Sequence, residues 1–204
     1  LAERLVANGH RVIGCARRID KLNALAETLG EAFLPVVMDV SDTASIPQII
    51  ADLPADFKQI DVLVNNAGLA LGTEPAHNAS LDDWMRMTDT NIKGLMAITH
   101  AVLPAMVARD SGYIINVGSI AGSWPYFGGN VYGATKAFVK QFSLNLRADL
   151  IGTQVRVTNL EPGNVAGTEF SNVRYHGDDD KAAQVYDGFK TMTGDDIGDI
   201  LLWL

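Results

Sequence analysis

A serine, a tyrosine and a lysine near the middle of the chain have the types and spacing that proton transfer needs. Tyr113–Val117 is a short apolar, β-branched run typical of a buried strand, and Ser119 follows where that strand should end. We expect a helix to begin near Asn130, and on it Tyr132 and Lys136, four residues apart, share one face. Because ligands of open α/β sheets bind outside the carboxyl ends of the strands, the three side chains can meet at one reacting atom.

The chemistry of this group depends on the lysine. A free phenol has a pKa of about 10, which is too high for useful proton exchange at neutral pH. An ammonium group beside it favours the phenolate and lowers that pKa, so Tyr132 beside Lys136 is a candidate proton donor and acceptor. Ser119 would hold the substrate oxygen. The alternative is an ordinary surface Tyr and Lys with Ser119 in a turn, and the spacing S-x12-Y-x3-K favours the catalytic interpretation.

This spacing, with Asn65-Asn66-Ala67-Gly68 upstream, resembles the short-chain dehydrogenase/reductase family over essentially the whole chain. The chain is also similar to a bacterial branch of that family in the segments AGSWPYFGGNVYGATKAFVKQFSLNLRADL and EPGNVAGTEFSNVR. That branch uses NADP(H) to oxidise small 3-hydroxy acids, such as serine and 3-hydroxypropionate, or to reduce malonic semialdehyde. The resemblance implies an oxidoreductase in which Ser119, Tyr132 and Lys136 are catalytic. Ser119 and Tyr132 would also contact the substrate, and Tyr132 and Lys136 the cofactor.

Composition limits the class of protein. The 204 residues, 48% of them hydrophobic, suit one α/β domain that spans positions 1–204. A net charge of −8 argues against a nucleic-acid or anionic-membrane partner, since both attract basic patches. The one cysteine excludes an intrachain disulfide, and no apolar run approaches the roughly 18 residues of a membrane span. We expect a cytoplasmic protein without a metal site.

Strand patterns alternate with helix patterns along the chain, which predicts a three-layer, doubly wound parallel sheet of Rossmann-like type. The expected strands are His10–Cys15, Phe33–Met38, Ile60–Val64, Tyr113–Val117 and Gln154–Leu160. The expected helices include Asp20–Leu29, Ser41–Leu53, a long helix that begins after Ser80, Val131–Leu150 and a last helix that Thr193 caps.

Both ends of the sequence depart from this plan. Residues 1–7 read as a helix with no strand before it, and we find neither G-x-G-x-x-G nor the family's TGxxxGxG between a strand and a helix. The chain ends on the apolar run Leu201–Leu204. We therefore expect that the first strand, the diphosphate loop and the C-terminal end lie outside this sequence.

Arg17 and Arg18 follow the first expected strand and indicate which dinucleotide binds. In dinucleotide-binding folds an acidic residue near this point accepts the ribose 2′-hydroxyl, whereas arginine accommodates a 2′-phosphate. There is no acidic residue between Val12 and Ile19. A basic helix start would be slightly unfavourable against the helix dipole, so we predict NADP(H) over NAD(H).

The resemblance implies further cofactor contacts. Asp39 and Val40 would meet the adenine ring, although Asp39 has an alternative as a turn residue. The Thr of the nicotinamide contact usually comes one place earlier after Pro-Gly, and here Gly167 is an additional residue. The implied contacts at the strand ends are Asn65, Ala67, Gly68, Pro162, Gly163, Val165 and Thr168.

Asn91 falls on the apolar stripe of the long helix, with Leu95, Ile98 and Val102. A buried amide without partners costs a few kcal/mol, so something must hydrogen-bond it. One possibility is a core Asn satisfied by backbone groups. The resemblance implies the other, a catalytic Asn that holds a water between Lys136 and solvent as a proton relay.

Residues 169–190 are expected to form a lid over the substrate pocket. Within it, the Arg174 guanidinium is suited to hold a substrate carboxylate in a fork. The alternative is a surface ion pair with one of Asp178, Asp179 or Asp180, and the sequence leaves both open.

The resemblance also implies a homo-oligomer, a dimer or tetramer in which the helix with Asn91 and Val131–Leu150 meet a second subunit. Phe138, Phe142 and Leu146 suit either that interface or the chain's own core. Two rival functions remain open: a reductase of neutral ketones or aldehydes, and a nucleotide-sensing protein without turnover. The complete set of Ser119, Tyr132, Lys136 and Asn91 argues against the sensor.

Overall fold

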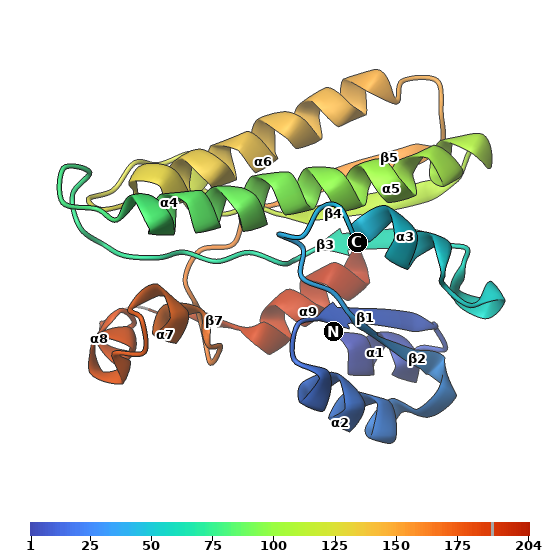
Figure 1. Ribbon diagram of the computed structural model, residues 1–204, viewed down its shortest axis with the longest axis horizontal. Helices are drawn as coiled ribbons and strands as arrows, with labels where there is room; N and C mark the ends of the chain where they lie inside the picture. The colour runs from blue at the N-terminus through green and yellow to red at the C-terminus, as the bar shows by residue number, and fades with distance from the viewer. Residues whose placement is uncertain (189) are drawn as a thin grey trace.

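The structure, a computed structural model, describes residues 1–188 and 190–204. Its paired strands all run parallel, with helices on both sides (Figure 1). The strands are β1 (Val12–Ala16), β2 (Phe33–Val37), β3 (Val62–Asn65), β4 (Gly112–Val117), β5 (Val155–Leu160), β6 (Val165–Ala166) and β7 (Met192–Thr193). The α-helices are α1 (Ala2–Ala7), α2 (Ile19–Leu29), α3 (Ile46–Ala51), α4 (Leu81–Thr88), α5 (Leu95–Ala108), α6 (Asn130–Asp149), α7 (Phe170–Arg174), α8 (Asp179–Gln184) and α9 (Gly194–Trp203). A π-helical segment, η3 (Asp89–Gly94), joins α4 to α5, and short 3-10 turns lie at η1 (Gly30–Ala32), η2 (Ala55–Phe57) and η4 (Ile120–Gly122).

The strands form hydrogen-bonded groups of β1–β2, β3–β4–β5 and β6–β7. Every pair is parallel and is joined through helices or crossover loops, as βαβ units require. The predicted Rossmann-like parallel α/β class is therefore confirmed.

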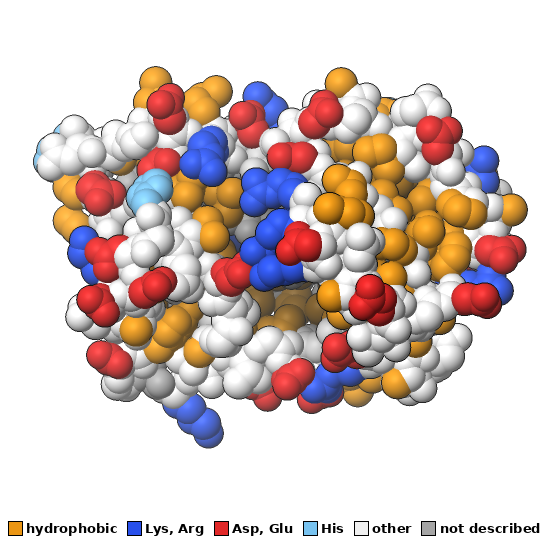
Figure 2. All heavy atoms as spheres, turned by 60° about the horizontal axis from the view of Figure 1, so that its bottom comes forward, with side chains coloured by type: hydrophobic (Ala, Val, Ile, Leu, Met, Phe, Trp, Pro, Cys, Tyr) orange, Lys and Arg blue, Asp and Glu red, His pale blue; other side chains and the backbone are white. Residues whose placement is uncertain are grey.

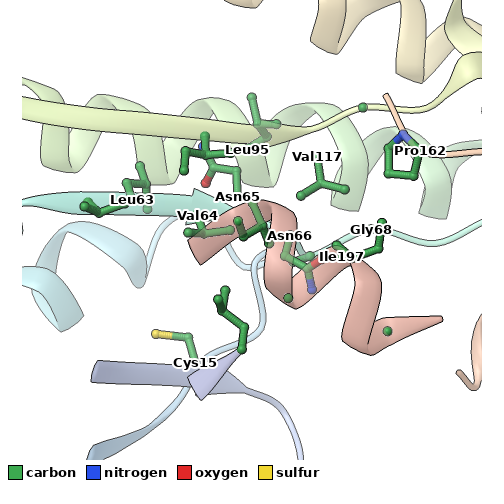
Figure 3. Close-up of a pocket in the computed structure, with 18 of the residues that line it drawn as sticks. Cys15, Leu63, Val64, Asn65, Asn66, Gly68, Leu95, Val117, Pro162 and Ile197 are labelled. Atoms are coloured by element: carbon green, nitrogen blue, oxygen red, sulfur yellow. The ribbon is translucent and has the colours of Figure 1, made fainter. Parts of the chain in front are cut away.

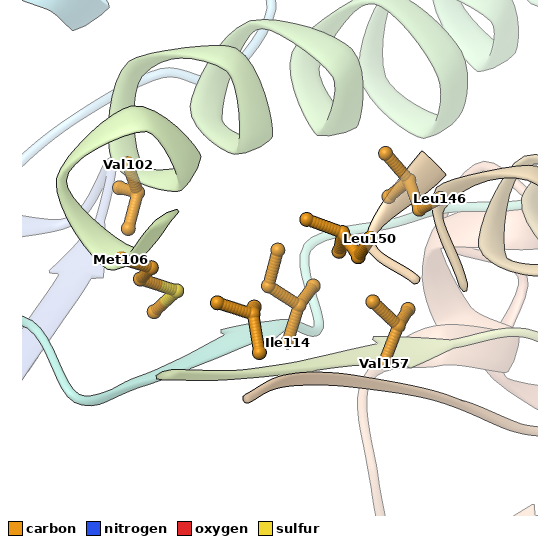
Figure 4. Close-up of a cluster of buried hydrophobic side chains, with 7 residues drawn as sticks. Val102, Met106, Ile114, Leu146, Leu150 and Val157 are labelled. Carbon is orange, nitrogen blue, oxygen red and sulfur yellow. The ribbon is translucent and has the colours of Figure 1, made fainter. Parts of the chain in front are cut away.

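Strand β4 is central because both of its faces are covered. On one face Ile114, fully buried, packs against α5, α6 and β5 (Figure 4). On the other face Tyr113 and Ile115 pack against Leu201 of α9. Side chains alternate between faces along a strand, so a continuous apolar run such as this one fits a strand buried between two helical layers.

The core on the α5–α6 side packs against the first half of β4. Its buried members are Val102, Met106, Ile114, Leu146, Leu150, Val155 and Val157. Gly112 begins β4 where a Cβ would lie 2.6 Å from the Met106 side chain, so the strand and α5 approach closely only without one.

The continuous helix Leu81–Ala108 is long and apolar enough to cross a membrane by length and composition, with a mean hydropathy of 1.3 over its most apolar window. Core helices of soluble proteins pass the same test. Here Val102 and Met106 pack against the sheet, and the polar side chains of Asn91 and Thr99 on the same helix are buried. Only 33% of that window is buried, so the helix packs one face against the sheet and leaves the other exposed.

The predicted helix Ser41–Leu53 is wrong in extent, because α3 covers only Ile46–Ala51. The Asp39 carboxylate accepts hydrogen bonds from the backbone N–H and the hydroxyl of Ser41, at 2.9 and 2.7 Å. Such side-chain bonds offer the backbone a turn instead of a helix. Pro47, which suits the first turn of a helix, then marks the late start.

Candidate active site

The three candidate catalytic side chains lie where β4 ends against α6. Ser119 caps η4, and its Oγ accepts a hydrogen bond from the Ala121 N–H at 3.1 Å. Tyr132 and Lys136 stand one turn apart near the start of α6, with Lys136 Nζ 5.9 Å from the centre of the tyrosine ring. Lys136 Nζ also donates to the carbonyl of Val117, the last residue of β4, at 2.8 Å.

A glycine that the sequence analysis did not single out makes this convergence possible. A Cβ at Gly122 would lie 2.6 Å from the backbone carbon of Lys136. Because real Cβ contacts are never that short, only glycine lets η4 pack directly on the α6 backbone and bring Ser119 toward Tyr132. The signal in the sequence is the Ala-Gly-Ser that follows Ser119-Ile120.

Burial dominates the protonation chemistry of the pair. Burial raises the pKa of the Tyr132 phenol, while the Ser119 side chain and the charge of Arg174 lower it. Burial also lowers the pKa of Lys136 to about 8, because a desolvated ammonium is disfavoured. Lys136 is not among the groups that shift the Tyr132 pKa here, so the expected lowering of that pKa by Lys136 stays a prediction. The ammonium is directed at the Val117 carbonyl and is itself partly destabilised.

Asn91 is buried, and its amide is fully engaged by protein groups. Its Oδ1 accepts from the Leu69 N–H at 2.9 Å, and its Nδ2 donates to the Leu69 carbonyl at 2.8 Å and to Thr135 Oγ1 at 3.0 Å. The Thr135 hydroxyl donates in turn to the Tyr132 carbonyl at 2.8 Å. Of the two possibilities, the Asn satisfied by neighbouring groups is the one that the side chain adopts, and the water relay stays a prediction.

Asn65 ties the sheet to its helices. Its Nδ2 donates to Asn116 Oδ1 at 2.8 Å and to Thr99 Oγ1 at 3.1 Å, and Asn116 Nδ2 donates to Ser143 Oγ at 2.8 Å. These buried bonds join β3 and β4 to α5 and α6. The Asn65 amide is therefore engaged inside the fold, and a ligand contact through it stays a prediction.

A cleft of about 1530 Å³ lies between β1 and β3 along the length of these strands and extends past the carboxyl ends of β3, β4 and β5 (Figure 3). Gly68 lines it, and a Cβ there would be 3.3 Å from Asn91 Oδ1 and 3.4 Å from Lys136 Nζ. The predicted site residues that line the cleft are Val40, Asn65, Ala67, Gly68, Ser119, Tyr132, Lys136, Pro162, Gly163, Val165, Thr168 and Arg174.

Three predicted cofactor residues do not line this cleft. Asp39 is engaged with Ser41, which is the turn role that the sequence left open, and Arg17 is exposed. Arg18 donates two hydrogen bonds to the Glu169 carboxylate, at 3.1 and 2.5 Å. Neither Glu169 nor its second partner, Lys21, was among the predicted site residues.

The expected lid contains α7 and α8, and the short parallel pair β6–β7 ties its two ends together. Arg174 lies at its inner edge, with its guanidinium carbon 5.4 Å from the ring centre of Tyr126 and 5.9 Å from that of Tyr132. The guanidinium donates to the Gly72 carbonyl and to the Tyr126 hydroxyl, at 3.3 and 3.2 Å. Residue 189 of the predicted lid lies outside the described residues.

The alternative of an Arg174 ion pair with the neighbouring aspartates is not found. Asp178 pairs with Lys181, and Asp179 accepts from Asn172. In the described part of the chain no carboxylate lies within 4.0 Å of the Arg174 guanidinium. Arg174, which lies at the cleft beside Tyr132, can therefore donate hydrogen bonds from its guanidinium to the carboxylate of a bound acid.

Comparison with known proteins identifies this arrangement. The family model described as short chain dehydrogenase matches residues 1–178. The chain belongs to the short-chain dehydrogenase family. Its strand-end serine, its tyrosine and lysine on the next helix and its Asn-Asn-Ala-Gly turn occupy one cleft, as the family motif implies.

Individual relatives are similar over the whole chain. It is 59% identical to an NADP-dependent 3-hydroxy acid dehydrogenase of Salmonella typhi, covering 100% of this chain and 82% of the relative. It is 48% identical to a serine 3-dehydrogenase of Agrobacterium fabrum, covering 100% of this chain and 81% of that relative. Among solved structures, the closed form of a serine dehydrogenase complexed with NADP+ superposes with a TM-score of 0.97 at 56% identity, covering 99% of this chain and 82% of the other.

Proposed function

We propose that this chain transfers hydride reversibly between NADP(H) and a small 3-hydroxy acid of the serine or 3-hydroxypropionate type. Family membership supports the oxidoreductase class, and the relatives named above support the cofactor and the hydroxy-acid substrate. The finer choice of substrate rests on Arg174, whose guanidinium faces the cleft beside Tyr132.

The residues present fit the cofactor. Arg18 already holds an anion of this chain, the Glu169 carboxylate, through a two-pronged contact that a phosphate can also accept. Gly68 lacks the Cβ that would crowd the cleft at Lys136. The residues that would hold NADP(H) are Arg17, Arg18, Asp39, Val40, Asn65, Ala67, Gly68, Tyr132, Lys136, Pro162, Gly163, Val165 and Thr168. When bound, the nicotinamide supplies or accepts the hydride.

The chain's own residues handle the substrate oxygen and its proton. Ser119 Oγ hydrogen-bonds the carbonyl oxygen, and the Tyr132 hydroxyl donates a proton to it during reduction. Lys136 places positive charge one helical turn from Tyr132, which stabilises the phenolate that this transfer leaves behind. Asn91 maintains the geometry, because it joins the backbone of the buried Leu69 to Thr135 and thus to the Tyr132 carbonyl. Its proposed water relay returns the proton to Lys136.

Arg174 is the observation that carries the acid substrate. It lies at the cleft beside the proposed proton donor. Among the described residues, its guanidinium has hydrogen-bond acceptors but no carboxylate partner. A substrate carboxylate supplies that partner, and a charge-assisted bond contributes about 1.5–3 kcal/mol. A neutral ketone gains nothing from this group.

The test follows NADPH absorbance during oxidation of serine and 3-hydroxypropionate, with a 2-alkanol and NAD+ as controls. We expect Arg174→Met to raise KM for the acids by about 10- to 100-fold and to leave the alkanol nearly unaffected. Arg147→Met, an exposed arginine on α6 away from the cleft, is the matched control and should change neither. Tyr132→Phe should abolish turnover while retaining cofactor binding.

The outcomes separate the rival functions. Turnover of the alkanol alone would leave a dehydrogenase of neutral substrates. Equal effects of Arg174→Met on the KM of both substrate classes would reject the proposed contact between Arg174 and the substrate carboxylate. Bound cofactor without any turnover would favour a nucleotide sensor, and retained turnover in Tyr132→Phe would reject the proton donor.

We also propose that the chain forms a cytoplasmic homo-oligomer, a dimer or tetramer, through α4, α5 and α6, which form an outer layer (Figure 1). Met85, Met96, Val107 and Leu144 on these helices are between 39% and 49% exposed. Leu146, in contrast, is buried in the protomer core, and Phe142 packs against that core.

A further inference from the structure

Three charged side chains from opposite ends of the chain meet outside the catalytic group. The Glu169 carboxylate accepts from both terminal nitrogens of Arg18, at 3.1 and 2.5 Å, and from Lys21 Nζ at 2.8 Å. Arg18 and Lys21 belong to the turn and first residues of α2, directly after β1, whereas Glu169 caps α7 of the lid. All three side chains are more than half exposed. Figure 2 shows Lys and Arg side chains gathered with acidic ones beside a hollow in the face that the cleft opens on.

This contact uses the same donors that a phosphate would use. Arginine presents its N–H groups as a fork that fits two oxygens of either a carboxylate or a phosphate. Glu169 occupies both terminal nitrogens of Arg18, so a phosphate cannot take the same fork while the carboxylate remains. The two cations share one carboxylate, which leaves one positive charge in the three-residue cluster.

The carboxylate is nevertheless easy to displace. Ion pairs between exposed side chains contribute only about 0–1 kcal/mol, since water screens both charges. A phosphate monoester carries about −1.5 to −2 charges at neutral pH and accepts through three oxygens, so it interacts with two cations more strongly than one carboxylate does. The Arg18 and Lys21 contacts hold the Glu169 pKa down at about 2, and the competing group is therefore charged throughout the neutral range.

We propose that Arg18 and Lys21 together bind the 2′-phosphate of NADP(H), and that the Glu169 carboxylate competes with this phosphate for the two cationic side chains. This inference rests on the proposed NADP(H) function and adds Lys21 and Glu169 to it. Glu169 directly follows Thr168 and precedes the helix that carries Arg174. A phosphate that displaces Glu169 therefore releases the N-terminal end of α7, where the expected lid begins, from its contact with α2.

Binding calorimetry at low ionic strength tests the competition without relying on turnover. The ligands are 2′,5′-ADP, which carries the 2′-phosphate, and 5′-AMP, which does not. Glu169→Gln should tighten binding of 2′,5′-ADP by about 3- to 5-fold and leave 5′-AMP unchanged, since an ion pair between exposed side chains is weak. Lys21→Gln should weaken 2′,5′-ADP alone by a similar factor. Glu27→Gln removes the same charge from the exposed far end of α2 and should change neither affinity.

Any other result would contradict a specific part of this proposal. Unchanged binding of 2′,5′-ADP by Glu169→Gln would reject the competition, and weaker binding would show that Glu169 contacts the bound nucleotide instead. An unchanged affinity of Lys21→Gln for 2′,5′-ADP would show that Lys21 does not contact the 2′-phosphate. A wild-type protein that binds 2′,5′-ADP no better than 5′-AMP would overturn the NADP(H) assignment itself, and this inference with it.

Discussion

At the scale of single residues, the site depends on a lysine and a tyrosine that burial pushes in opposite directions. The Tyr132 pKa is raised and the Lys136 pKa is lowered to about 8, so burial moves the two values apart and favours the neutral form of both side chains. The hydrogen bond of Lys136 to Val117 keeps the ammonium at the strand end despite its burial.

The lowered Lys136 pKa predicts a pH dependence of stability. Between pH 8 and 10 the unfolded chain keeps the proton of this lysine while the folded chain loses it, so the unfolded state binds more protons and stability rises with pH. The raised Tyr132 pKa acts only above about pH 10, in the opposite direction. Urea unfolding should show the wild-type free energy of unfolding rising by about 2 kcal/mol relative to Lys136→Met across this window.

The exposed Lys58 provides the control for that measurement. Lys58→Met should track the wild type at every pH, because the Lys58 side chain is exposed and stays in contact with water when the chain folds. A constant difference between wild type and Lys136→Met from pH 8 to 10 would contradict the buried-lysine interpretation.

At the scale of elements, the π-helical segment η3 sets how α4 and α5 meet the rest of the fold. It places Asn91 toward Leu69 and Thr135, and it ends at Gly94. A Cβ at Gly94 would lie 2.7 Å from the Val40 carbonyl, so the helix and the loop after β2 touch through bare backbone. Single π-helical turns inside longer helices are frequent at functional sites, and here the turn serves both the cleft wall at Val40 and the catalytic helix.

Gly94→Ala tests this contact. Its backbone is helical, with φ −60° and ψ −48°, so alanine costs nothing in conformation and favours the helix by about 1 kcal/mol. We nevertheless expect a loss of about 1–3 kcal/mol in the free energy of unfolding, because the added carbon clashes with backbone that cannot move away easily. Gly198→Ala in α9 is the matched control, since its Cβ would lie 3.4 Å from the flexible Arg4 side chain and 3.8 Å from the Leu1 nitrogen, without a clash, and it should be neutral or stabilising. Equal changes in the free energy of unfolding for the two substitutions would mean that the loop at Val40 moves to accommodate the added carbon.

At the scale of the whole molecule, the proposed cofactor residues come from two hydrogen-bonded groups of strands, which the Arg18–Glu169 contact joins. Arg17 and Arg18 follow β1, whereas Val165 and Thr168 follow β5, and these strands belong to different hydrogen-bonded groups. A ligand that contacts both groups links them and binds the folded chain alone. The cofactor should therefore stabilise the entire fold rather than one side of the cleft.

Thermal unfolding with and without cofactor measures this linkage. NADP+ at 100 times its Kd should add about 2.7 kcal/mol, which for a chain of 204 residues corresponds to a rise in Tm of about 5–10 °C. NAD+ at the same concentration should raise Tm much less, because it lacks the 2′-phosphate. Equal shifts with both dinucleotides would argue against phosphate recognition at Arg17 and Arg18.

The sequence by itself determined the local parts of the site. Ser119, Tyr132 and Lys136 lie within one strand end and one helix turn, so their convergence follows from short-range geometry that spacing expresses directly. The parallel α/β class likewise follows from the alternation of strand and helix patterns. The extent of α3 did not follow, because the Asp39–Ser41 turn depends on a competition between nearly equal local hydrogen bonds.

Only the tertiary structure decided which distant residues meet. Glu169 reaches Arg18 across 151 positions, and Asn91 closes on Leu69 and Thr135 from other elements. Whether Arg174 paired with a neighbouring aspartate or faced the cleft also depended on how α7 and α8 fold back on the sheet. Charge and hydrogen-bonding capacity are properties of each residue, and the sequence displays them, but partners at long range are set by packing, which no local pattern encodes.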